Sequence, residues 1–141
     1  MNVNYSLDHD AYPPRRAYTD DAGTDLALNH IAFIPAGQHR LCHTGVHVAI
    51  PRGHVGLLFV RSSMGIKKNL VLSNGTGVID SGYTGEIMVS LHNTGRRMRV
   101  IEPGQYVVQL VVVPIPEFEL NRVGVLEDSE RGTNGIGSSG Q

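Results

Sequence analysis

Residues 77–87 read GVIDSGYTGEI, a sequence that predicts a short β-hairpin with a carboxylate near its tip. An apolar strand runs into Asp80, and the turn that follows carries the ring of Tyr83 between two glycines. Glycine allows main chain to approach a ligand closely, and an acid at a strand end can orient and deprotonate a water molecule. We therefore expect a pocket in which backbone binds a small flat molecule and Asp80 carries out the chemistry.

The composition is that of one globular domain. The chain has 141 residues, of which 40% are hydrophobic and 18% charged, and its formal net charge is -1. This charge argues against nucleic acid as a partner. No apolar run is long enough to cross a bilayer, and no secretory signal pattern is recognisable, so we expect a cytoplasmic, intracellular protein without a membrane partner. Cys42 is the single cysteine, which excludes an internal disulfide.

Short strands separated by turns account for most of the chain. The 17 glycines and 7 prolines interrupt every helical pattern, while apolar residues recur at strand spacing. The run 107–115 is the most apolar stretch and predicts a strand that is buried on both faces. We predict an all-β fold, a sandwich or barrel with little helix, that forms a single domain over residues 1–126. By composition alone, the glycine-rich tail at 127–141 is typical of a disordered end.

Three further segments have residue types that suit a phosphate ligand. Arg61, Ser62, Ser63 and Gly65 in the segment RSSMG offer a guanidinium fork, two hydroxyls and a turn glycine, although a strand-end turn with a solvated arginine would look the same. Asp25 follows a glycine and suits the hydration shell of a divalent cation, or caps its own turn. Gln109 lies within an apolar strand, so its amide must bond either neighbouring backbone or a ligand.

The histidines of residues 39–47 suggest a metal site, but their spacing argues against it. His39, His43 and His47 would share one face of a straight strand, at steps of about 13 Å, which is too far for a single ion. We therefore interpret them as a solvated strand face. Lys67 and Lys68 are expected to be exposed and to add positive potential near an anionic ligand.

Taken together, these segments resemble the trimeric all-β dUTPases (deoxyuridine triphosphate nucleotidohydrolases). Five motifs match in order: AGTDL at 22–26, RSSMG at 61–65, NGTGVIDSGYTGEI at 74–87, PGQYVVQL at 103–110 and RGTNGIGSSG at 131–140. The resemblance implies a dUTPase-like jelly-roll or β-barrel, a homotrimer, and Mg²⁺-dependent hydrolysis of dUTP to dUMP and pyrophosphate by attack of water on the α-phosphorus. It also implies that residues 127–141 form a flexible arm that closes over the active site rather than a disordered end.

The resemblance also assigns roles by position. Asp80 matches the acid that activates water, and Tyr83 matches the ring beneath the deoxyribose, which leaves no space for a ribose 2′-hydroxyl. Asp25 matches an acid that contacts the metal indirectly, through water. The remaining matches are substrate-binding positions: Asn74, Gly77, Val78 and Ile79 for uracil; Arg61, Ser62, Ser63, Gly65 and Gln109 for the phosphates; and Arg131, Ile136, Gly137, Ser138 and Ser139 in the closing arm.

This chain departs from the family pattern at three positions. Gly82 replaces a usual second Asp, Thr84 a frequent Arg, and Ile136 a Phe that stacks on uracil. Two other functions remain open. A dCTP deaminase of the same fold would need a catalytic Glu where this chain has Ser90, and a nucleotide-sensing regulatory module would bind a protein partner.

Overall fold

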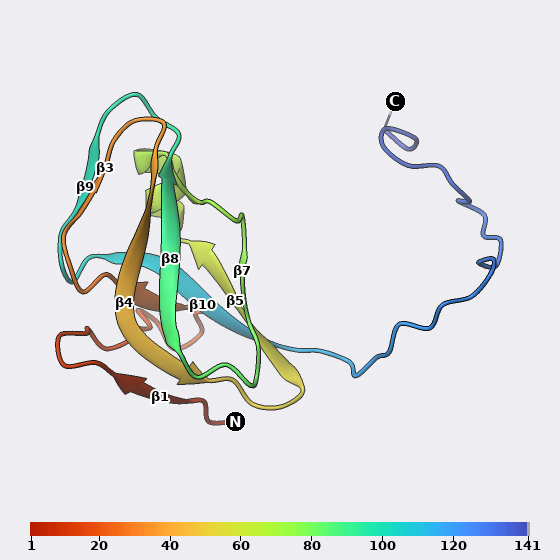
Figure 1. Ribbon diagram of the computed structural model, residues 1–141, viewed down its shortest axis with the longest axis horizontal. Helices are drawn as coiled ribbons and strands as arrows, with labels where there is room; N and C mark the ends of the chain where they lie inside the picture. Colours follow the sequence, from red (N-terminus) through yellow and green to blue (C-terminus); the bar gives the residue numbers. More distant parts are fainter. Residues whose placement is uncertain (141) are drawn as a thin grey trace.

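A computed structural model describes residues 1–140, which form two four-stranded sheets and one two-stranded sheet (Figure 1). Every pairing is antiparallel, which confirms the predicted all-β class. A π-helical turn, η1 (Ser63–Lys67), is the helical element of the described chain. The first sheet has the order β1 (Asn4–Leu7), β4 (His39–Ala49), β8 (Glu86–Asn93), β6 (Leu70–Leu72); the second has the order β2 (Thr24–Ala27), β10 (Tyr106–Pro114), β5 (His54–Val60), β7 (Gly77–Ile79); and β3 (Ala32–Ile34) pairs with β9 (Arg99–Ile101).

Strand β8 illustrates how the sequence pattern forms the core. Ile87, Val89 and Leu91 are at most 3% exposed, while Met88, Ser90 and His92 point away from the core, as the alternation predicts. These apolar side chains belong to a single cluster to which both large sheets contribute. Burial of the cluster is the main stabilising contribution to the fold.

Strand β10 is buried on both faces only over its first half, so the prediction for residues 107–115 is wrong for the second half. Val107, Val108 and Leu110 are buried, whereas Val111 to Val113 are half-buried and Ile115 is 46% exposed. The reason lies in the pairing. Strand β10 has neighbours on both sides as far as Leu110 and pairs only with β5 beyond that residue.

A wide bulge interrupts β4 at Gly45. His43 pairs with Met88 and His47 pairs with Glu86, so that β4 uses four residues where β8 uses two. Gly45 has φ +66°, and a Cβ atom there would lie 2.7 Å from the Cβ of Ala11. The bulge changes the regular spacing of the histidines and places the carboxylate of Glu86 between His43 and Gly45.

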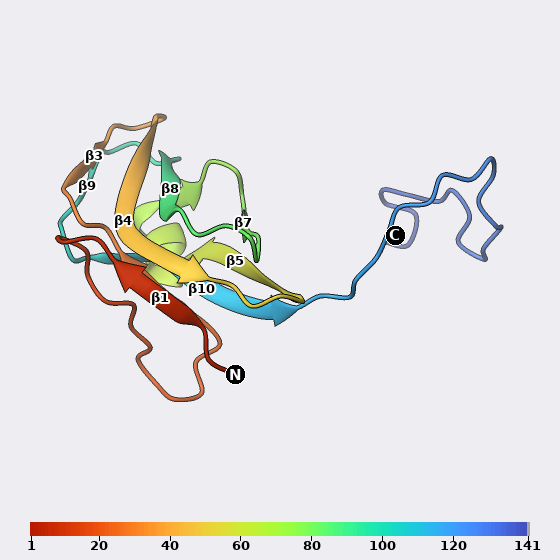
Figure 2. The same ribbon diagram turned by 60° about the horizontal axis from the view of Figure 1, so that its bottom comes forward.

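The chain beyond β10 runs away from the body of the molecule (Figures 1 and 2). Residues 115–140 are exposed and lie outside the strands, and the domain boundary expected at 126 falls within this segment. Among the described residues, no helix is long and apolar enough to span a membrane.

Replacing Gly45 with alanine is expected to lower the free energy of unfolding by about 3 kcal/mol, because a positive φ and a clash with Ala11 act together. Gly53→Ala is the matched control, since Gly53 also has a positive φ, +80°, but open space around its Cα. The control should lose about 1 kcal/mol. Urea unfolding measures both values, and equal losses would show that the clash is relieved without cost.

Candidate active site

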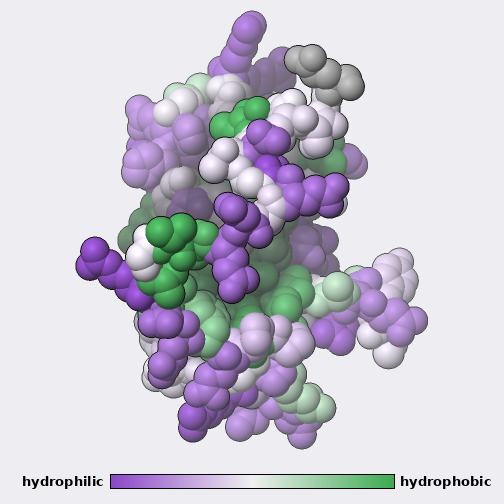
Figure 3. Space-filling model, turned by 90° about the vertical axis from the view of Figure 1, so that its right-hand side faces the viewer, coloured by the Kyte–Doolittle hydropathy of each residue, from purple (hydrophilic) through white to green (hydrophobic). Residues whose placement is uncertain are grey.

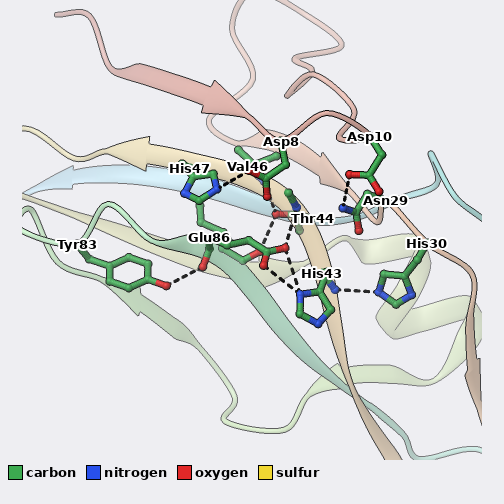
Figure 4. Close-up of polar contacts among 12 residues, drawn as sticks. Asp8, Asp10, Asn29, His30, His43, Thr44, Val46, His47, Tyr83 and Glu86 are labelled. Atoms are coloured by element: carbon green, nitrogen blue, oxygen red, sulfur yellow. Dashed lines mark hydrogen bonds and ion pairs between the residues drawn. The ribbon is translucent and has the colours of Figure 1, made fainter.

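The turn after Asp80 forms, but the predicted hairpin does not, because β7 pairs with β5 in one sheet and β8 pairs with β4 and β6 in the other. The hairpin prediction is therefore wrong: residues 80–85 carry the chain from one sheet to the other, and we call them the connecting turn. Asp80 is exposed directly after β7, and its carbonyl accepts a hydrogen bond from the Tyr83 N–H at 3.1 Å. The Tyr83 hydroxyl donates to the main-chain oxygen of Glu86 at 2.7 Å (Figure 4). The ring lies against Gly85, where a Cβ atom would stand 2.6 Å from the ring carbon Cζ. Gly85 therefore gives the aromatic ring a fixed position beside Asp80.

A pocket of about 200 Å³ opens beside the connecting turn. Its lining brings Asp80 and Tyr83 together with apolar side chains: Val78, Ile79, Ile87 and Met88, and also Glu86. A carboxylate and an aromatic ring in a largely apolar hollow suit a small flat ligand. Asn74 and Gly77 do not line this pocket. Asn74 lies in the turn before β7, where its side-chain amide donates to the carbonyl of Thr76 at 3.3 Å, and Gly77 is buried against Leu58.

A second polar group forms where β2, β10 and the end of β5 meet. The Arg61 Nε lies 3.0 Å from an Asp25 carboxylate oxygen, and an Arg61 terminal nitrogen donates to the carbonyl of Tyr106 at 3.2 Å. Gln109 pairs with Asp25 across the sheet, and its amide lies over Gly23, where any Cβ atom would overlap the amide oxygen. The absence of a side chain at Gly23 thus leaves space for Gln109 beside the ion pair.

The segment RSSMG forms the start of η1 next to this group. The N–H groups of Met64 and Gly65 both donate to the carbonyl of Arg61, and Met64 is buried as an anchor. Ser62 is the N-cap residue without a side-chain capping bond, and the Ser63 hydroxyl has no hydrogen-bond partner among the described residues. Both hydroxyls are therefore available to a ligand beside the Arg61 guanidinium.

The two groups lie at opposite ends of β5. Gly56 pairs with Ile79, next to Asp80, whereas Arg61 follows the other end of the strand. Five residues of extended strand separate Gly56 from Arg61, a distance of about 17 Å. A single chain thus does not bring the predicted carboxylate and the predicted phosphate-binding residues to one place.

The arm residues lie apart from both groups. Arg131 donates from Nε to the Asn134 carbonyl at 2.9 Å, and together with Ser138 and Ser139 it lines a hollow of about 550 Å³ that the arm itself forms. Ile136 is fully exposed. Gly137 has φ +76°, which explains glycine at this position.

The solvated face expected for the histidines of β4 holds for His39 and His43, which are exposed, whereas His47 is half-buried. His43 Nδ1 lies 3.0 Å from the Glu86 carboxylate, which also accepts from the Gly45 N–H at 2.9 Å. His47 contacts the Thr84 carbonyl. It also contacts the Asp8 carboxylate (Figure 4). Glu86 belongs to the motif at 74–87, yet no role could be assigned to it from sequence, because its partners come from a bulge that no local pattern predicts.

Ionisation in this region follows from the contacts. Burial alone would raise the pKa of Glu86, but hydrogen bonds from His43 and the Gly45 N–H outweigh it, so the pKa lies below its ordinary value. Burial raises the pKa of the Cys42 thiol to about 11, which keeps it protonated and unreactive at neutral pH.

Comparison with known proteins identifies relatives over almost the whole chain. The dUTPase family model matches residues 10–140. The chain is 43% identical over 128 residues to the deoxyuridine 5'-triphosphate nucleotidohydrolase of Cutibacterium acnes, covering 90% of this chain and 84% of the relative. It is 42% identical over 137 residues to that of Rhodococcus erythropolis, covering 95% and 82%.

Solved structures show the same similarity. The dUTPase of Staphylococcus bacteriophage 80alpha with dUPNHPP superposes with a TM-score of 0.87 at 31% identity, covering 99% of both chains, and that protein is described as controlling the transfer of virulence genes. A variant dUTPase of phage phi11 of S. aureus, described for its coordination of a structural Mg(II) ion, superposes with a TM-score of 0.82 at 28% identity, covering 91% of this chain and all of its own.

Gly85→Ala is expected to lower the free energy of unfolding by about 1–2 kcal/mol, because the added methyl group displaces the Tyr83 ring and breaks its hydrogen bond to Glu86. Gly82→Ala is the matched control, since nothing lies within 4 Å of a Cβ atom there. The control should leave stability unchanged or raise it by up to about 1 kcal/mol. Thermal unfolding distinguishes the two, and a loss of the same size in both would contradict the packing of the ring on Gly85.

Proposed function

Because the chain belongs to the dUTPase family and hydrolyses dUTP to dUMP and pyrophosphate, we propose that Asp80 activates the water that attacks the α-phosphorus. The observation that carries this proposal is the position of Asp80, exposed at the end of β7 in a pocket that it shares with Tyr83. A carboxylate there can accept a proton from a water molecule held between it and the phosphate. Tyr83 supports the deoxyribose, and the backbone at Gly77, Val78 and Ile79, with Asn74, binds uracil.

The phosphates of the substrate bind to the group at the end of β5. Arg61 presents a guanidinium fork to the phosphate oxygens, the Ser62 and Ser63 hydroxyls donate to them, and Gly65 leaves room for close approach. Gln109 adds an amide donor from β10. As charge moves to the leaving pyrophosphate, fixed donors of this kind stabilise it without reorganising.

The residues beside this group suit Mg²⁺. Mg²⁺ keeps most of its waters and is commonly bound by substrate phosphates with one or two carboxylates, and Asp25 offers one such carboxylate, 15% exposed, next to Arg61. Asp25 would hold the ion through water. When bound, Mg²⁺ offsets phosphate charge and fixes the conformation of the triphosphate.

A homotrimer completes the site. Asp80 lies beyond the pair of Ile79 and Gly56, and about 17 Å of β5 separates Gly56 from Arg61, so a substrate that contacts both Asp80 and Arg61 would lie between copies. The arm supports this assembly, because Phe118, Leu120 and Val125 are each more than 70% exposed, and such side chains call for a covering surface. On the side of the molecule from which the arm leaves, apolar groups show between polar ones (Figure 3).

The arm supplies the last contacts to the substrate. Arg131 meets the terminal phosphate, Gly137, Ser138 and Ser139 close over the nucleotide, and Ile136 covers the base. Closure of such a segment excludes bulk water from the reaction. A cytoplasmic location stays a prediction of the sequence.

Two alternatives are separated by experiment. Incubation with each deoxynucleoside triphosphate and Mg²⁺ should release pyrophosphate from dUTP, whereas ammonia from dCTP would indicate the deaminase; at the corresponding position Ser90 Oγ lies 2.7 Å from Ser73 Oγ. A regulatory role in binding a protein partner has one observation in its favour, the similarity to the phage 80alpha protein.

Asp80→Asn is expected to lower kcat by a factor of about 10² to 10⁴, because the amide cannot accept the proton of water, while the affinity for dUTP changes little. Pyrophosphate release and calorimetric binding measure the two quantities. Asp20→Asn is the control, an exposed carboxylate without a side-chain hydrogen bond in the described part of the chain, and should keep wild-type kinetics. Full activity in Asp80→Asn would refute the assignment, and a wild type that binds but never hydrolyses would indicate a sensor.

Ile136→Phe is expected to raise kcat by about threefold, because an aromatic ring can stack on the base where the aliphatic side chain cannot. Ile136→Leu retains an aliphatic group of the same size and serves as the control with wild-type turnover. Steady-state kinetics with dUTP checks both variants, and a turnover that is unchanged or slower in the phenylalanine variant would reject a stacking role at this position.

A further inference from the structure

His47 on β4 contacts both the connecting turn and the N-terminal segment. From β4, its Nδ1 lies 3.0 Å from the main-chain carbonyl oxygen of Thr84. Its Nε2 lies 3.1 Å from a carboxylate oxygen of Asp8, just beyond β1 (Figure 4). The imidazole is therefore held between the turn that follows Asp80 and the N-terminal segment. Its side chain is 28% exposed, so solvent reaches it but does not surround it.

The two contacts of His47 fix its protonation state. A main-chain carbonyl and an ionised carboxylate are both acceptors, so each ring nitrogen must donate a proton. A neutral imidazole has one N–H and can satisfy only one of these partners. Both hydrogen bonds form together only when His47 is the doubly protonated cation.

His30 in the same region has the opposite requirement. Its Nε2 accepts a hydrogen bond from the His43 N–H at 2.9 Å, and its Nδ1 faces the carbonyl oxygen of Ile31 at 2.8 Å. One nitrogen must be bare and the other must carry a proton, which defines a neutral tautomer. The charged state of His47 thus follows from its own partners and is not common to all histidines of this surface.

The bond from His47 to Thr84 ties the connecting turn directly to β4. Within residues 81–85, the other hydrogen bonds of the described structure stay within residues 80–86, from the Tyr83 N–H to Asp80 and from the Tyr83 hydroxyl to Glu86. The turn contains two glycines and has little conformational restraint of its own. The contact between His47 and Thr84, together with the pairing of Glu86 with His47 at the end of the turn, therefore sets the orientation of the turn relative to β4.

We propose that His47 is a positioning residue that, as a doubly protonated imidazole, holds the connecting turn with Asp80 and Tyr83 in the orientation that hydrolysis requires. The proposal rests on the role given to Asp80 above. Small displacements of a group that must align a water molecule with a phosphate cost large factors in rate. His47 thus acts on kcat through the position of the connecting turn, without touching the substrate.

The charges around His47 favour the cation. Hydrogen bonding to the Thr84 carbonyl raises the pKa of His47 above its ordinary value of 6.5, and the Asp8 and Glu86 carboxylates add to this shift against the opposing effect of burial. The other titratable groups nearby are His43 on the same strand and Tyr5 on β1. Because the folded-state pKa is raised, the stabilisation is complete below about pH 6.5 and is lost as the pH rises through the raised value.

Two substitutions separate the contacts of His47. The short amide of His47→Asn can place its N–H₂ group near the position of Nδ1 and keep the bond to Thr84 without titrating. The longer amide of His47→Gln reaches the position of Nε2 and keeps only the bond to Asp8. His92→Asn is the control, since His92 lies on β8 with no side-chain hydrogen bond among the described residues.

The test compares pH profiles of kcat at saturating dUTP and Mg²⁺. The wild type and His92→Asn should lose activity by about threefold to tenfold on the alkaline side, as His47 deprotonates. His47→Asn should keep the kcat of the wild type at neutral pH and show no alkaline loss. His47→Gln should have, at every pH, the reduced kcat that the wild type shows only at alkaline pH, with KM changed less than kcat. An NMR titration of the wild-type full chain should give His47 a pKa above 6.5 and needs no variant.

Either of two results would overturn the proposal. The first is a titration of His47 at or below its ordinary pKa, and the second is an unchanged alkaline limb in both His47 variants. A failure of the Asp80 assignment is distinguishable, because it appears as activity of Asp80→Asn while the titration of His47 is unaffected.

Discussion

Strand β5 fixes the distance between the phosphate-binding group at Arg61 and the carboxylate of Asp80, and the proposed site depends on this distance. It pairs with β10 on one side and β7 on the other, so its two ends carry different chemistry. Arg61 follows one end, next to Asp25 and Gln109, and Asp80 lies beyond the other, next to the ring of Tyr83. Because an extended strand inside a sheet cannot shorten, the phosphate-binding group and the carboxylate of one chain stay apart. In the proposed trimer, activity therefore requires assembly, because one chain alone does not contain a complete site.

The ion pair between Asp25 and Arg61 prepares the phosphate-binding group for its ligand. Two partly buried charges without partners would be costly, and pairing them at 3.0 Å holds both side chains in place before substrate binds. In the proposed complex, Arg61 turns to phosphate oxygens and Asp25 to the water shell of Mg²⁺. Each charge then exchanges one partner for another of the same sign. This limits the loss of solvation on binding, and Gln109 keeps its place over Gly23 throughout.

The strands could be predicted from sequence wherever one pattern decided the outcome. The alternation of β8 is local, and the glycines around Tyr83 define the turn, so both are readable from residues 77–93. The separation of β7 and β8 into different sheets is not readable there, because it depends on their partners β5 and β4 elsewhere in the chain. The burial of β10 could not be predicted from its own residues, because it depends on where the neighbouring strand β2 ends. The bulge at Gly45 depends on contacts with Ala11, distant in sequence, and the pairing of Asp25 with Arg61 joins residues on separate strands. The motif order assigned the candidate residues, but it contained no information on which of them one chain brings together.

The connecting turn has little rigidity of its own. The two side chains that hold it, Glu86 and His47, respond to pH in opposite directions. Glu86 has a lowered pKa, so its bonds to the Gly45 N–H and His43 are present at neutral pH and are lost as the pH falls through that value. His47 has a raised pKa, so its bond to Thr84 weakens as the pH rises through it. The turn is held at both ends only between these two limits. A catalytic carboxylate needs to be ionised, which sets an acid limit of the same kind, and the histidine adds an alkaline limit that the carboxylate alone does not have.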